Sequence, residues 1–190
     1  MSRTIALLVA STLLSGGAVV AAAQTPTTDI HTHANPLSLE GQPAPRIEGR
    51  LHIGPRVPGL DELKGKVVLV FFWAHWCVEC RAESPTLAKL VDKYRSQGLA
   101  IVAPTQQYGY VEGGRPAPPE RELRYIIQTR DTHYSFLRDI PVPVGEANHK
   151  TYGADAIPLH VLIDRQGIVR FYNAGRMTGE ELEAAIRKLL

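Results

Sequence analysis

The stretch that decides the fold is Phe71-Phe72-Trp73-Ala74-His75-Trp76-Cys77-Val78-Glu79-Cys80-Arg81-Ala82-Glu83-Ser84-Pro85. It overlaps a mostly apolar run, residues 66–73, which predicts a strand buried on both faces in the middle of a sheet. Beyond Cys77 the apolar residues recur at helical spacing as far as Gly98, so a helix follows the strand. Both cysteines of the chain therefore lie at the start of this helix.

The order of the remaining segments indicates a single α/β domain over residues 41–190. A second buried strand, residues 99–103, follows the helix, and this order implies a right-handed parallel crossover. Residues 160–164 and 168–172 flank an Asp-Arg-Gln-Gly turn and predict an antiparallel hairpin, so we expect a mixed central β-sheet. The Pro/Gly-rich residues 105–119 are expected to form a long loop. Helices that cover both faces of the sheet are expected at residues 120–132, at residues 147–152 and after the capping box of Thr178 and Glu181.

Length and composition suit one globular domain. The chain has 190 residues, of which 44% are apolar and 21% charged. A formal net charge of +2, without a basic cluster, is too small for a nucleic-acid footprint. We therefore expect no nucleic-acid partner.

The first 40 residues differ in composition from the rest of the chain. Arg3, an apolar stretch and the alanines before Gln24 predict a secretory signal peptide over residues 1–23, with an uncleaved membrane anchor as the alternative. Residues 24–40 predict a flexible leader, in which His31-Thr32-His33 is interpreted as part of a solvated tail because no third metal ligand is evident. We expect a periplasmic or otherwise extracytoplasmic protein, in contact with a membrane only if the anchor is retained.

The spacing of the two cysteines favours a redox-active pair. A structural disulfide normally joins cysteines far apart in sequence, because its benefit grows with the loop that it closes. Cys77 and Cys80 would close a loop of only four residues, which leaves a permanent short disulfide as the weaker alternative. Two cysteines are too few for the usual zinc site, and Arg81 excludes a C-x-x-C-H haem attachment.

The residues around the cysteines resemble those of the thioredoxin superfamily. The pattern Cys-x-x-Cys-Arg-x-Glu-x-Pro is similar to that of the exported TlpA/ResA-like thiol-disulfide oxidoreductases. Three segments carry the resemblance: Trp73 to Cys80, Pro85, and Ile157-Pro158 ahead of a strand that ends Leu162-Ile163-Asp164-Arg165-Gln166-Gly167. The resemblance implies a thioredoxin-like domain that uses the Cys77/Cys80 pair without a metal or other cofactor, and a cis peptide bond at Pro158.

The resemblance also implies clients and a direction for the reaction. It favours a reductant of protein disulfides, serving clients such as apocytochrome c cysteines during cytochrome c biogenesis and supplied by a membrane electron donor. Three residues depart from the family pattern. Thioredoxin has a buried acid where this chain has Phe71, many relatives have Pro where this chain has Glu79, and Thr is frequent where this chain has Leu159.

The chemistry expected of the pair follows from its place at a helix start. The positive end of the helix dipole stabilises an anion, so Cys77 is predicted to be the nucleophilic thiolate. Cys80, one turn further on, is predicted to resolve the mixed disulfide. Glu83 lies three residues after Cys80 on the same helical face, and we hypothesise that it accepts the Cys80 proton. A solvated helix carboxylate is the alternative for Glu83.

Five further residues are expected to tune the site or bind clients. Glu79 would oppose the Cys77 thiolate by roughly 0.7 kcal/mol at about 6 Å in water, which is too little to reverse the helix effect. His75 would act oppositely if protonated, but an exposed loop histidine is expected. Trp76 and Ile157 are expected to contact client proteins, and Pro158 to hold the backbone before it extended beside the disulfide.

Two other classes of function remain open at the level of sequence. One is a copper-binding or metallochaperone protein, in which Cys77, Cys80 and His160 hold Cu(I). The other is a redox-inert interaction domain that keeps the fold for docking.

Overall fold

The computed structural model describes residues 39–190, and the predicted signal peptide and most of the predicted leader lie outside these residues. The central sheet has four strands in the order β3-β2-β7-β8. Their bounds are Val67–Phe72 for β2, Leu99–Val102 for β3, Leu159–Ile163 for β7 and Val169–Ala174 for β8. Strand β2 is parallel to β3 and antiparallel to β7, and β7 is antiparallel to β8, so the sheet is mixed as predicted.

Strand β2 supplies the centre of both hydrophobic cores. Its residues Val67, Leu69 and Phe71 belong to one core cluster. The alternating residues Val68, Val70 and Phe72 belong to the other. Successive side chains of a strand point to opposite faces, and every residue of β2 is buried, which explains why this segment is apolar without interruption.

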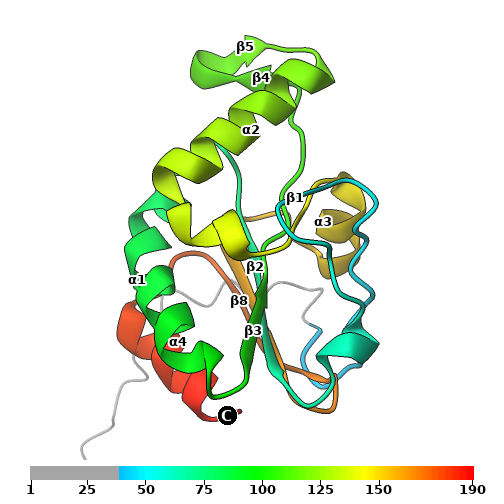
Figure 1. Cartoon of the computed structure of the whole chain (residues 1–190), viewed down its shortest axis with the longest axis vertical. Helices are drawn as coiled ribbons and strands as arrows, with labels where there is room; N and C mark the ends of the chain where they lie inside the picture. Colours follow the sequence, from blue (N-terminus) through cyan, green and yellow to red (C-terminus); the bar gives the residue numbers. More distant parts are fainter. Residues whose placement is uncertain (1–38) are drawn as a thin grey trace, which may run out of the picture.

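Helices cover both faces of the sheet (Figure 1). Helix α1, Val78–Arg95, packs on one face with α2, Pro119–His133, and α4, Gly179–Arg187. The short helix α3, Glu146–Tyr152, lies on the other face, where Tyr152 joins the second core cluster. Helix α4 begins with the predicted capping box: the Thr178 hydroxyl accepts from the Glu181 N–H, and the Glu181 carboxylate accepts from the Thr178 N–H. The arrangement is a single thioredoxin-like domain.

The segment predicted as a long loop is partly ordered into a hairpin, which corrects the expectation for residues 105–119. Strand β4, Tyr110–Val111, pairs antiparallel with β5, Arg115–Pro116. The chain reverses between them through a 3-10 turn, Glu112–Gly114, in which Gly113 and Gly114 both have φ of 71°. Residues with side chains rarely adopt this conformation, so two adjacent glycines permit the tight reversal. The hairpin projects beside the N-terminal end of α2, at the top of Figure 1.

The remaining elements are short. Strand β1, His52–Ile53, pairs antiparallel with β6, Val142–Pro143. Two more 3-10 turns cover Leu60–Leu63 and Ser135–Asp139. Within residues 39–190, no helix has the length and apolar character needed to cross a membrane.

Candidate active site

The two cysteines form a disulfide at the N-terminus of α1. Cys77 is the N-cap residue and Cys80 lies in the first turn, with 5.3 Å between their Cα atoms. The Cys80 N–H donates a hydrogen bond to the Cys77 Sγ at 3.0 Å. Cys77 is 3% exposed and Cys80 is fully buried, so both residues are buried in the disulfide form. Their roles as nucleophile and resolving thiol stay predictions. The hydrogen bond from the Cys80 N–H to the Cys77 Sγ is a direct form of the helix N-terminal stabilisation expected from the sequence.

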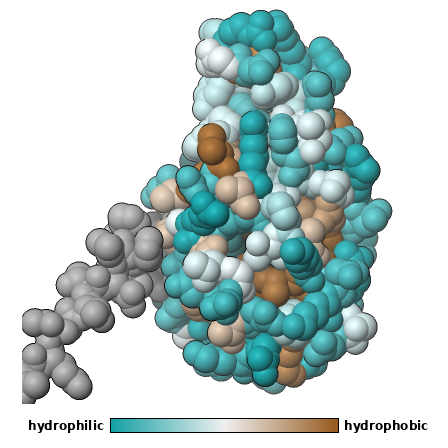
Figure 2. Space-filling model, turned by 90° about the vertical axis from the view of Figure 1, so that its left-hand side faces the viewer, coloured by the Kyte–Doolittle hydropathy of each residue, from teal (hydrophilic) through white to brown (hydrophobic). Residues whose placement is uncertain are grey.

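Two exposed apolar side chains lie next to Cys77 in the chain. Within residues 39–190 the exposed large apolar residues are Leu51, Trp76 and Val78, and the last two flank Cys77 in the chain. The Trp76 ring packs edge-on against Tyr108, with 5.3 Å between ring centroids. Elsewhere the surface of the α1 and α4 side is largely hydrophilic with separate apolar patches (Figure 2).

Pro158 and Ile157 come to the site from a different part of the chain. The Ile157–Pro158 peptide bond is cis, as the resemblance implied. Leu159 pairs with Phe72, so Pro158 lies at the end of the sheet from which the cysteine segment leaves β2. A surface cavity of about 300 Å³ has Trp76, Tyr108 and Ile157 in its lining. Trp76 and Ile157, the two residues predicted to contact clients, thus line one depression.

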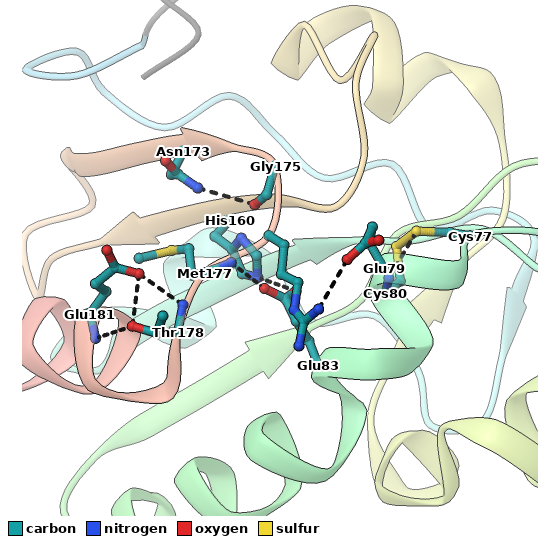
Figure 3. A network of polar contacts seen from close by, with 11 residues as sticks. Cys77, Glu79, Cys80, Glu83, His160, Asn173, Gly175, Met177, Thr178 and Glu181 are labelled. Carbon is teal, nitrogen blue, oxygen red and sulfur yellow. Dashed lines mark hydrogen bonds and ion pairs between the residues drawn. A yellow bond between two sulfur atoms is a disulfide. The ribbon is translucent and has the colours of Figure 1, made fainter. Parts of the chain in front are cut away.

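Glu83 is buried behind the disulfide, which rules out the solvated-carboxylate alternative. It is 4% exposed, and its Oε1 accepts a hydrogen bond from the Met177 N–H. Its Oε2 lies 3.2 Å from Nε2 of His160, a residue of β7 that is fully buried. Figure 3 shows the Glu83 and His160 side chains directed toward each other, with Met177 also next to the carboxylate. The carboxylate is therefore held by two elements distant in sequence.

Glu79 is exposed and has a cationic partner. Its Oε2 lies 3.3 Å from Arg176 Nη1, and both side chains are more than half exposed. The partner offsets part of the negative charge that Glu79 brings near Cys77, so the repulsion estimated from sequence is an upper value. Its tuning role stays a prediction.

His75 is buried, which corrects the expectation of an exposed loop histidine. It is 1% exposed, and its Nε2 lies 3.1 Å from Glu122 Oε1 on α2. Three tyrosine rings pack edge-on around it, with centroid distances from 5.2 to 5.7 Å: Tyr108, Tyr110 and Tyr125. Burial lowers the pKa of His75, although the Glu122 carboxylate opposes the shift. A neutral, enclosed imidazole does not supply the positive charge that the sequence interpretation considered.

Glu122 ties the β4–β5 hairpin to the active-site segment. Besides His75, it accepts hydrogen bonds from the Tyr108 N–H and from the Gly109 N–H, the latter at 2.9 Å. It is 1% exposed. Glu122 was not predicted, because the helical spacing placed only its apolar neighbours on the buried face of the helix. The available signal was a histidine beside the cysteines, which needs a polar partner if buried.

Tyr134 and Arg81 also contact the cysteine segment and were not predicted. The Tyr134 hydroxyl donates to the Cys77 carbonyl oxygen at 3.2 Å, and its ring packs on Trp73 with 4.6 Å between centroids. Burial raises the pKa of Tyr134, so the hydroxyl remains a donor. The Arg81 guanidinium donates to the carbonyl oxygen of His75. Together these bonds fix the backbone on both sides of Trp76.

The copper-binding alternative has no support. In the described part of the chain, no group of three or more His, Cys, Asp or Glu side chains is placed to hold a metal ion. His160 is directed toward Glu83, and the two cysteines are joined to each other.

A redox-active disulfide at a helix N-terminus, in a thioredoxin-like domain with a cis-proline beside it, defines a thiol-disulfide oxidoreductase. Comparison with known proteins agrees with this class. The chain belongs to the Redoxin family, which matches it over residues 39–189.

Individual relatives carry related descriptions. The chain is 31% identical to the thioredoxin-like protein YneN of Bacillus subtilis over 144 residues, which is 76% of each protein. It is 28% identical to the thiol-disulfide oxidoreductase ResA of Bacillus thuringiensis, over 68% of this chain and 67% of ResA. Among solved structures, the exposed lipoprotein thioredoxin Etrx1 of Streptococcus pneumoniae superimposes with a TM-score of 0.56 at 20% identity, covering 73% of this chain and 98% of Etrx1. The last similarity concerns the fold alone.

Proposed function

We propose that the protein reduces disulfides of client proteins outside the cytoplasm, with Cys77 as the nucleophile. The observation that carries the proposal is the position of Cys77 at the N-cap of α1, where the Cys80 N–H donates to its Sγ at 3.0 Å. After reduction of the pair, the same N–H and the helix dipole stabilise a thiolate at Cys77. The thiolate is the form that attacks disulfides.

The reaction proceeds in two balanced steps. The Cys77 thiolate attacks one sulfur of the client disulfide, a mixed disulfide forms, and one client thiolate leaves. Cys80 then loses its proton and attacks the Cys77 Sγ, which releases the second client thiolate. The client gains two electrons, and the protein is left with the Cys77–Cys80 disulfide. Glu83, one helical turn after Cys80, accepts the proton in this proposal.

Client recognition is assigned to the surface around Trp76, Ile157 and Pro158. An extended client segment can pair with the backbone before Pro158, while its side chains contact Trp76 and the adjacent Tyr108. Tyr108 leads into the β4–β5 hairpin, so this hairpin is the part of the fold best placed to restrict which clients fit.

The place of action and the partners rest on the sequence. The signal-peptide pattern of residues 1–23 supports an extracytoplasmic location. An enzyme that reduces disulfides in an oxidising compartment must be reduced again after each turnover, so a membrane electron donor belongs to the proposal. Proteins with closely spaced cysteines, such as apocytochrome c, are the proposed clients.

Two measurements test this function. Catalysed reduction of insulin by dithiothreitol should depend on Cys77, so the Cys77→Ser variant should fall to the uncatalysed rate. The midpoint potential of the pair, measured against glutathione, should lie toward the reducing end of the range from about −120 to −270 mV. Equal insulin reduction by Cys77→Ser would refute the oxidoreductase mechanism, and a potential near about −120 mV would refute the reducing direction alone.

A further inference from the structure

Glu83 and His160 form an isolated buried pair on the α1 side of the sheet. His160 is fully buried and Glu83 is 4% exposed, with 3.2 Å between His160 Nε2 and Glu83 Oε2. Apart from this contact, neither ring nitrogen of His160 has a hydrogen-bond partner within residues 39–190. Buried polar groups are normally satisfied, so two that face mainly each other point to a purpose other than stability.

The register of the sheet explains how β7 delivers an imidazole to α1. His160 pairs with Phe71 of β2, and the two rings pack with 5.4 Å between centroids. Phe71 belongs to the core cluster that also contains Cys80, and the neighbours Leu159 and Val161 belong to the opposite cluster. His160 therefore points to the side of the sheet on which the resolving cysteine and Glu83 lie. Its place in β7, two residues after the cis-proline, fixes it relative to both.

The carboxylate of the pair also has a way to exchange protons with solvent. Glu83 and Met177 line a surface cavity of about 670 Å³ between α1 and the segment that joins β8 to α4. The Met177 N–H holds Oε1, so Oε2 is the oxygen that remains directed at the imidazole (Figure 3).

We propose that His160 is a positioning residue that acts through Glu83, and that the two side chains hold the proton of Cys80 as one unit during resolution of the mixed disulfide. In this step neutral His160 starts as the Nδ1–H tautomer, so that Nε2 carries no proton. The Cys80 Sγ–H bond breaks, the proton passes to Glu83, and it is retained on His160 Nε2. The Cys80 sulfur attacks the Cys77 sulfur, and the client thiolate leaves with the electron pair of the broken S–S bond. The inference rests on the proposed role of Glu83 and adds His160 to it.

Two groups hold the proton better than one because a buried charge carries a desolvation cost. An ordinary imidazole binds a proton more tightly than an ordinary carboxylate, by about two pKa units. Transfer of the proton to His160 leaves imidazolium beside carboxylate, and the attraction between them offsets part of the desolvation cost of both. Glu83 alone would become a neutral acid next to the newly formed disulfide and would return its proton to solvent more readily.

Other ionisable groups around the pair set the background for any pH effect. The ionisable groups that line the same cavity are Glu79, Arg176 and Glu181. Tyr134, which follows α2, interacts with Glu83 and also with Arg81 of α1. Glu79 and Arg176 are paired with each other, and Glu181 holds the helix cap, so none of these three is directed at His160.

The test follows the two steps separately with 5,5′-dithiobis(2-nitrobenzoate) and the reduced protein. Attack by Cys77 releases one coloured thiolate, and resolution by Cys80 releases the second, so stopped-flow absorbance gives two phases. The second phase should slow as pH falls, because the pair is then already protonated. His160→Gln should slow the plateau of the second phase about tenfold and move its acid limb at least about one unit to lower pH, while the first phase is unchanged.

Matched variants separate proton holding from packing. His149→Gln removes another buried histidine, which packs against Phe72 on the opposite face of the sheet and lines the cavity of Trp76 and Ile157. The comparison therefore uses only the position of the acid limb, which should stay in place. Glu83→Gln should slow the second phase about a hundredfold, and adding His160→Gln to it should have little further effect. If the two substitutions slow the second phase additively in the double variant, the proposal that Glu83 and His160 act as one unit is overturned.

A measurement that leaves His160 in place covers the case in which His160→Gln does not fold. The ring NMR signals of His160 should shift in Glu83→Gln and stay in place in Glu79→Gln, because only the Glu83 carboxylate faces the ring. Unchanged signals in Glu83→Gln would refute the inference. Loss of both coloured phases in Cys77→Ser, together with a normal acid limb in folded His160→Gln, would leave the proposed function standing and reject only the role of His160.

Discussion

Replacing Glu122 with Gln tests whether this buried carboxylate joins the hairpin to the active-site segment. Glu122 Oε1 faces His75 Nε2 and accepts from the Tyr108 N–H, while Oε2 accepts from the Gly109 N–H. A carboxylate offers only acceptors, whereas one side of an amide is a donor. In either orientation of the amide, at least one buried N–H therefore faces another donor.

The magnitude follows from the number of bonds disturbed. A buried N–H that loses its charged acceptor and finds no other partner lowers the free energy of unfolding by about 2 kcal/mol. For a domain of this size the melting temperature should fall by about 4–8 °C. Glu120→Gln, an exposed carboxylate in the first turn of the same helix, should lower it by less than about 2 °C because only the helix-dipole interaction weakens.

Thermal and urea unfolding followed by circular dichroism measure both variants. If Glu122→Gln and Glu120→Gln unfold within about 0.5 kcal/mol of each other, the carboxylate does not hold the hairpin and the interpretation of His75 as its buried partner fails. A second readout is limited proteolysis of the hairpin, which should become faster in Glu122→Gln alone.

Two further expectations concern pH and capping. Burial lowers the pKa of His149 to about 4, so the folded protein binds fewer protons than the unfolded chain below about pH 6.5. The free energy of unfolding is therefore not reduced by His149 above that pH, and His149 lowers it by about 3 kcal/mol as pH drops toward 4. Urea unfolding at both pH values should show a smaller loss of this free energy for His149→Gln than for the unsubstituted protein, and an equal loss would contradict the expectation. Thr178→Ala removes the acceptor of the Glu181 N–H and should cost about 1 kcal/mol in the same assay; a change below about 0.3 kcal/mol would show that α4 does not depend on its cap.

The parts of the fold that could be predicted from sequence are those with local signals. Strand β2 is apolar at every position because both of its faces are buried, and α1 carries an apolar stripe at helical spacing. The Cys77/Cys80 pair could be interpreted for the same reason, since its chemistry depends on a helix start that lies next to it. Gly113-Gly114 were assigned only to a long loop, because the short strands on each side are too brief to show a period.

The parts that could not be predicted depend on contacts between distant segments. His75 and Glu122 are 47 residues apart, and nothing local shows that the hairpin closes over both. His160 stands in an apolar strand, so its burial could be expected, but its partner could not. The copper-binding alternative grouped it with the cysteines as a metal ligand, whereas the register of β7 against β2 places it beside Glu83.

The burial of Cys77 has a kinetic consequence. Only 3% of this residue is exposed, and Trp76 and Val78 stand on either side of it. Thiol-disulfide exchange requires in-line access to the attacked sulfur, so exchange with dissolved small thiols is expected to be slower than exchange with a protein docked against Trp76 and Val78. The rate of electron exchange is then set by how well a partner fits this surface, while small thiols reach the same equilibrium with the pair over a longer time.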